Sequence, residues 1–92
     1  MSQPGTDYQE ELLLEEEVVA EKNLVLYNDE VNTFDHVIES LMAVCGHDPL
    51  QAEQCTVIVH YKGKCNVKTG ELTELTSMCT ALHDRGLSAE IH

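Results

Sequence analysis

Residues 23–34 read NLVLYNDEVNTF and hold the elements from which the fold can be predicted. The apolar run at 24–27 is typical of a buried strand, and the polar triplet at 28–30 ends it. Asn32 or Thr33 is placed to cap a helix that begins directly afterwards. The stretch therefore predicts a strand joined to a helix by a short polar loop.

The middle of the chain predicts two helices. The first carries one apolar stripe at helical spacing and ends at Gly46; the stripe comprises Phe34, Val37, Ile38, Leu41, Met42 and Cys45. The second begins at Asp48-Pro49 with Gln51 able to complete a capping box, and it extends to about His60-Tyr61. Its β-branched end at 56–59 is also compatible with a strand, but the strong start and the Lys62-Gly63 stop favour a helix.

The last third of the chain predicts two short strands around a third helix. The first strand covers 65–68 and turns at Thr69-Gly70, and a closing edge strand covers 87–91. The helix between them ends at Arg85-Gly86, and its apolar stripe comprises Leu72, Leu75, Cys79 and Leu82. The order β-α-α-β-α-β predicts a two-layer α+β domain, with a three-stranded antiparallel sheet packed against three helices.

Length and charge limit the kinds of protein this can be. The chain has 92 residues, enough for one small domain, and a formal charge of −12. Residues 1–22 are rich in acids and predict a flexible acidic extension ahead of a core at 23–92, although a simple solubilising tail remains the alternative. The charge disfavours nucleic acid and anionic membranes and favours a cationic partner such as a peptide α-amine.

The cysteines and the N-terminus indicate the compartment. The start of the chain lacks the basic and apolar parts of a signal peptide, so we expect a cytoplasmic protein. We also expect it to be a monomer. In that setting the cysteines at 45, 55, 65 and 79 are interpreted as reduced thiols. Their spacing disfavours a zinc site, and we expect no metal or other cofactor. No pattern links a cysteine to a catalytic histidine or forms a phosphate-binding loop, so an enzyme is not expected.

Two polar positions could bind a ligand. Asn28, Asp29 and Glu30 offer an amide oxygen and carboxylates with no nearby base, which suits an ammonium group. A simple turn leading into the helix is the alternative, because Asn and Asp favour turns. His60 follows an apolar segment, where a structural role is common, but a neutral imidazole can also accept a hydrogen bond from an ammonium group. The other histidines, at 36, 47, 83 and 92, show no pairing in the sequence.

The two motifs together resemble the ClpS family. That family has a strand ending in Asn-Asp-Asp or Asn-Asp-Glu, as at 28–30, and a later Val-His-x-x-Gly segment, as at 59–63. Either motif alone is weak, but their separation and their place in the order of elements make the pair specific. The resemblance covers about residues 23–91, the whole predicted core.

The resemblance implies an adaptor that binds N-degrons and delivers them to an AAA+ unfoldase of the ClpA or ClpC type and its peptidase. By this resemblance Asn28, Asp29 and His60 bind the substrate α-amine, with Glu30 on an acidic rim. The first side chain, a bulky Leu, Phe, Tyr or Trp, would enter an adjacent apolar pocket. The acidic extension would engage the unfoldase.

The pocket departs from the family pattern, although Val37 and Val59 match it. Asn32 stands where Thr is common, Phe34 stands where a gate-like Met is usual, and Thr56 replaces a Met that lines the pocket. Phe34 is expected to narrow the pocket, and Thr56 to make its base smaller and more polar, which leaves the preferred first residue open.

The unfoldase-docking surface matches the family only in part. Glu71 matches an acidic docking position, but Thr76 replaces the Lys that accompanies it. Together with the altered pocket, this keeps an alternative function open, a Clp-docking domain that recognises something other than N-degrons.

Overall fold

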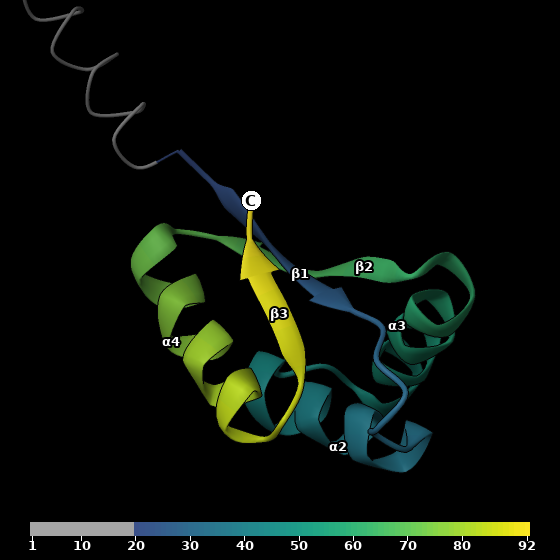
Figure 1. Cartoon of the computed structure of the whole chain (residues 1–92). Coiled ribbons are helices and arrows are strands. Elements are labelled where there is room, and N and C mark those ends of the chain that lie inside the picture. The colour runs from purple at the N-terminus through teal and green to yellow at the C-terminus, as the bar shows by residue number, and fades with distance from the viewer. Residues whose placement is uncertain (1–19) are drawn as a thin grey trace, which may run out of the picture.

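The computed structural model describes residues 20–92, which form one two-layer α+β domain (Figure 1). The expected order of elements is confirmed, and residues 1–19 of the predicted acidic extension lie outside the described part of the chain. Within residues 20–92, no helix combines the length and apolar character required to cross a membrane. The elements are β1 (Lys22–Tyr27), α2 (Phe34–Cys45), α3 (Pro49–Lys62), β2 (Lys64–Gly70), α4 (Leu72–Asp84) and β3 (Ser88–Ile91).

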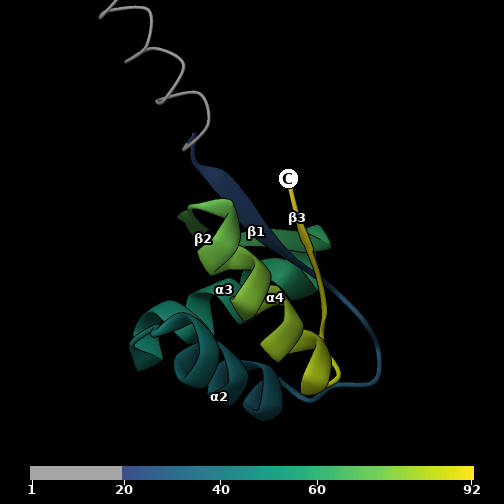
Figure 2. The same ribbon diagram turned by 90° about the vertical axis from the view of Figure 1, so that its left-hand side faces the viewer.

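The sheet is antiparallel with strand order β2-β1-β3, so β1 is central and β3 is an edge strand, as predicted. The register of β1 with β2 shifts between Leu24 and Val25, where a bulge interrupts the ladder. Leu24 and Leu26 are fully buried, and Val25 between them is more exposed. The three helices lie on one side of the sheet, which Figure 2 shows from the side.

The core is aliphatic, with cysteines among its members, as the scarcity of aromatic residues predicts. Leucines from the sheet and from two helices meet at its centre with no exposed surface or almost none: Leu24, Leu26, Leu41, Leu75 and Leu82. This burial packs α4 against β1 and α2 against α3 and α4, and so fixes where the loop after β1 lies.

Local signals explain the helix ends. The first cap is Thr33, not Asn32, because the Thr33 side chain accepts a hydrogen bond from the His36 N–H at 3.1 Å. Asp48 accepts from the Gln51 N–H at 2.8 Å. Gly63 ends α3 at φ 92°, a left-handed conformation that favours glycine. The interpretation of 56–59 as helix is therefore confirmed.

Some predicted core positions are exposed. Leu72 is 54% exposed, because it is the first residue of α4 and the described residues cover it incompletely. Phe34 and Met42 on α2 are also partly exposed. Helical spacing identified the correct face, but it did not show how far along each helix the neighbouring elements reach.

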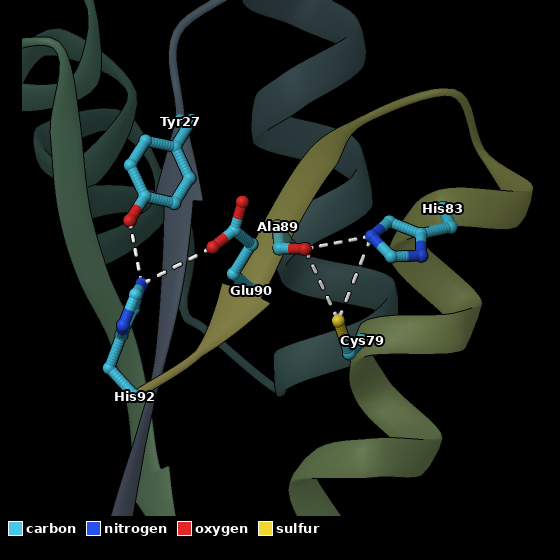
Figure 3. Close-up of polar contacts among 6 residues, drawn as sticks. All are labelled: Tyr27, Cys79, His83, Ala89, Glu90 and His92. Carbon is cyan, nitrogen blue, oxygen red and sulfur yellow. Dashed lines mark hydrogen bonds and ion pairs between the residues drawn. The ribbon is translucent and has the colours of Figure 1, made fainter.

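Histidines satisfy carbonyl groups at both edges of the sheet, a role that the sequence did not indicate. His47 donates from Nε2 to the Val67 carbonyl on β2 at 2.7 Å. His83 donates from Nε2 to the Ala89 carbonyl on β3 at 2.8 Å (Figure 3). Because a carbonyl oxygen can only accept, both rings carry the proton on Nε2. His47 and His83 therefore hold neighbouring elements to the sheet through hydrogen bonds, although no sequence pattern pairs them.

We predict that Leu75→Ala lowers the free energy of unfolding by about 2–5 kcal/mol, since Leu75 is fully buried. Leu72→Ala is the matched control, and we expect a change of no more than about 0.5 kcal/mol, because surface substitutions cost little. Urea denaturation followed by circular dichroism measures both. Equal losses in the two variants would contradict the assignment of Leu72 to the surface.

Candidate functional site

A cavity of about 310 Å³ lies where the end of β1, the loop after it, the start of α2 and the second half of α3 meet. It contains every residue that the sequence analysis assigned to amine binding, to the acidic rim and to the side-chain pocket. These are Asn28, Asp29, Glu30, Asn32, Phe34, Val37, Thr56, Val59 and His60. The cavity is also lined by residues that the sequence analysis missed: Leu26, Tyr27, Thr33 and Leu87.

The Asp29 carboxylate organises the loop after β1. Its Oδ1 accepts hydrogen bonds from the N–H groups of Val31 and Asn32, each at 2.9 Å. Its Oδ2 accepts from Asn32 Nδ2 at 2.8 Å. Burial works to raise the pKa of Asp29, but the Asn32 and Val31 donors and the nearby His36 outweigh it. The pKa therefore lies below its ordinary value of 3.8, and the group is ionised at neutral pH.

The Asn32 side chain joins this loop to a distant part of the chain. Besides donating to Asp29, its Nδ2 donates to the Gly86 carbonyl at 2.9 Å, across 54 residues of sequence. Both partners are pure acceptors, so the orientation of the amide is determined. Beside it, His36 Nε2 donates to the Arg85 carbonyl at 2.7 Å. The turn between α4 and β3 therefore braces the loop and brings Leu87 into the cavity wall.

Asn28 and His60 keep their polar side-chain atoms available. The Asn28 backbone N–H donates to the Gly63 carbonyl at 2.9 Å, which fixes the residue beside the end of α3. Within residues 20–92 the Asn28 amide makes no side-chain hydrogen bond, and the same holds for the His60 ring. The other four histidines of the chain each have a polar partner, so His60 differs from all of them.

Aromatic and aliphatic side chains form the rest of the wall. The Phe34 ring meets His60 edge-on, with centroids 5.2 Å apart, and is 44% exposed, so it stands at the opening. Thr56 and Val59 are buried. The Thr56 hydroxyl donates to the Ala52 carbonyl at 2.7 Å, so its proton is used within α3. The expected polarity of Thr56 is thereby reduced.

The cysteines lie outside the cavity and are free thiols. Burial raises the pKa of Cys45 to about 11. Burial, together with the neighbouring Cys65, raises the pKa of Cys55 to about 12. Both are neutral thiols at physiological pH, a state unsuited to nucleophilic attack.

The expected docking residues lie apart from the cavity. Glu71 precedes α4 and Thr76 lies within it; both are exposed, and neither lines the cavity. The Thr76 hydroxyl donates to the Leu72 carbonyl at 2.7 Å. Figure 1 shows α4 and α3 at opposite sides of the helical layer, so α4 offers a surface separate from the cavity.

The family model described as ATP-dependent Clp protease adaptor protein ClpS matches residues 20–90. The chain belongs to the ClpS family. Among solved structures, the ClpS domain resembles Agrobacterium tumefaciens ClpS2 bound to L-phenylalaninamide, with a TM-score of 0.75 and 18% identity over 78% of this chain and 94% of that one. A search of curated proteins finds no match. The ClpS fold predicted from the two motifs is thus confirmed, and the family is one of protease adaptors.

We predict that Asn32→Ala raises the pKa of Asp29, because it removes the side-chain donor to Oδ2. NMR titration of the carboxyl carbon measures this. Loss of the two side-chain hydrogen bonds should also destabilise the ClpS domain by about 1–2 kcal/mol at pH 7. A lowered pKa stabilises the fold above the unfolded value of 3.8 and loses this effect as the pH falls through the folded value. The difference from wild type should therefore shrink below about pH 4.

Asn66→Ala is the matched control, since Asn66 also donates twice from Nδ2 but lies outside the cavity. It should leave the pKa of Asp29 unchanged. An Asp29 pKa that is the same in wild type and Asn32→Ala would refute the proposed organisation of the loop.

Proposed function

We propose that this ClpS-family chain captures the free N-terminus of other polypeptides through their α-amine and a bulky hydrophobic first side chain, and delivers them to a Clp protease. The observation that carries this proposal is the meeting, in one cavity of about 310 Å³, of available polar acceptors with an apolar wall. An N-terminal residue presents the complementary combination, a charged amine that donates hydrogen bonds beside an apolar side chain.

The amine would be bound by complementary charge and acceptors. An ammonium group has three donors and needs several acceptors when it leaves water. The Asn28 amide oxygen and a His60 ring nitrogen have no side-chain hydrogen-bond partner within residues 20–92. Asp29 is ionised at neutral pH and supplies negative charge beside them. Its Oδ1 already accepts two hydrogen bonds and its Oδ2 one, so Oδ2 keeps one acceptor site for the amine.

The first side chain would occupy the apolar part of the cavity. It is lined by Phe34 and Val37 of α2, Thr56 and Val59 of α3, Leu26 of β1 and Leu87 of the turn before β3. Burying a Leu or Phe side chain in such a place yields about 1.5–3 kcal/mol. The similar Agrobacterium tumefaciens ClpS2 was solved with L-phenylalaninamide, a ligand that combines a free amine with an aromatic side chain. That ligand supports the same division of the cavity here.

Delivery would use a surface separate from the cavity. Glu71 and Thr76 on the α4 side are exposed and remain accessible when a substrate fills the cavity. We infer that they contact a ClpA- or ClpC-like unfoldase, with the acidic residues before β1 engaging it further. On this proposal the chain is an adaptor without catalytic activity of its own.

The test is to titrate peptides that begin with Leu, Phe, Tyr, Trp or Ala, each free and N-acetylated, by fluorescence anisotropy. Peptides with a free amine and a bulky first residue should bind, and their acetylated forms should not. Asn28→Ala and His60→Ala should each weaken binding about ten- to a hundredfold, the effect of losing a charged hydrogen bond.

Asn66→Ala is the matched control for Asn28→Ala and should bind as wild type. Equal binding of free and acetylated peptides would sink the amine-capture proposal. It would favour the alternative, a Clp-docking domain for another kind of ligand, which the changes at Asn32, Phe34 and Thr56 suggested.

A separate prediction concerns docking. Glu71→Lys reverses a charge on the α4 side and should weaken binding to the N-terminal domain of a ClpA- or ClpC-like unfoldase by about fivefold or more. Peptide affinity should stay as in wild type, because Glu71 does not line the cavity. Surface plasmon resonance measures the first and anisotropy the second. Unchanged unfoldase binding would remove Glu71 from the docking surface.

A further inference from the structure

The face of α3 that points away from the core is apolar. One face of the helix is buried, through Ala52, Cys55, Thr56 and Val59. The opposite face carries the α3 stripe, which we define as Leu50, Gln54, Val57, Ile58 and Tyr61. Leu50 is 62% exposed and Tyr61 is 78% exposed. The stripe contains no charged residue, although 24% of the chain is charged, so it differs from an ordinary solvated helix face.

The α3 stripe is continuous with the cavity. Tyr61 meets the His60 ring edge-on, with centroids 5.0 Å apart. His60 in turn meets Phe34 at 5.2 Å, and both line the cavity. An aromatic series therefore runs from the cavity opening onto the outer face of α3. Figure 1 shows α3 at one side of the helical layer, away from α4.

We propose that the α3 stripe binds the residues that follow the first one in a captured polypeptide, and that it favours apolar side chains there. This inference rests on the proposed capture of N-termini in the cavity. It assigns the substrate class more narrowly, to chain ends whose first few residues after the anchoring one are apolar and uncharged.

The dimensions of the α3 stripe fit this occupant. From Tyr61 to Leu50 the helix rises about 16 Å, at about 1.5 Å per residue. An extended chain covers that distance with about five residues, at about 3.3 Å each. A second copy of the protein is a poorer fit, because a stable dimer buries about 800 Å² per partner and the α3 stripe offers only a few hundred. A partner steered by charge would find no charged group on it to pair with.

The test compares two peptides with the same free N-terminal Phe, the same length and the same C-terminal Lys. Residues 2–6 are Leu, Val and Ile in one and Ser and Gln in the other. Wild type should bind the apolar peptide about tenfold more tightly, the effect expected from partial burial of a few apolar side chains. The ratio of the two affinities is the readout, so any change at the cavity itself cancels.

Leu50→Ala and Tyr61→Ala should each reduce this ratio severalfold. Leu72→Ala, which removes a comparably exposed leucine outside the α3 stripe, is the matched control and should leave it unchanged. The effect of Leu50→Ala should disappear when the peptides are cut to three residues, because a short peptide cannot reach the far end of α3.

N-acetylated versions of both peptides separate the possible failures. A ratio near one, with binding still abolished by acetylation, overturns the α3 stripe and leaves amine capture intact. Binding that survives acetylation overturns amine capture, and with it this inference. A ratio that Tyr61→Ala and Leu72→Ala reduce equally, or a wild-type dimer in sedimentation that Tyr61→Ala dissolves, also overturns the assignment of the α3 stripe to substrate.

Discussion

The central position of β1 is the constraint on which the rest of the domain depends. It pairs with β2 on one side and β3 on the other, and its buried leucines belong to the core that the helices cover. The polar loop that follows it is therefore anchored to the most fully bonded strand of the molecule. The Asn28 N–H continues this anchoring by donating to the Gly63 carbonyl at the end of α3. The loop side of the cavity is thereby joined to the side that α3 forms.

The loop itself is held by charge as much as by chain geometry. The Asp29 carboxylate accepts hydrogen bonds from Val31 and Asn32, and the Asn32 side chain also donates to the Gly86 carbonyl. An acidic residue at a ligand site can thus serve the fold and the ligand together. Its negative charge reaches an ammonium group even though most of its lone pairs are used within the loop. The fold and the proposed amine site therefore share one carboxylate.

Much of this could be predicted from residues close together in sequence, and the remainder could not. The strand at 24–27, the Asp48-Pro49 helix start and the Gly63 stop are local signals, and all appear in the structure. The two family motifs, at 28–30 and 59–63, predicted that residues far apart in the sequence would line one site, and residues of both motifs line the cavity. The contact of Asn32 with Gly86 and the place of Leu87 in the wall were missed, because they depend on how α4 meets the loop. Leu72 was assigned to the core because periodicity reports a face and not the extent of its neighbours.

The histidines that donate to the outer strands have a consequence for a protein proposed to bind the ends of other chains. A strand edge with unpaired backbone groups invites another chain to add as a further strand. His47, between α2 and α3, donates to the Val67 carbonyl of β2, and His83 of α4 donates to the Ala89 carbonyl of β3. Cys79 donates to the same Ala89 oxygen at 3.4 Å. One carbonyl on each outer strand is therefore not free to pair with an added strand, which disfavours β-augmentation at that position. On the proposed function, the end of a captured chain would then be selected by its side chain and amine and not by backbone pairing.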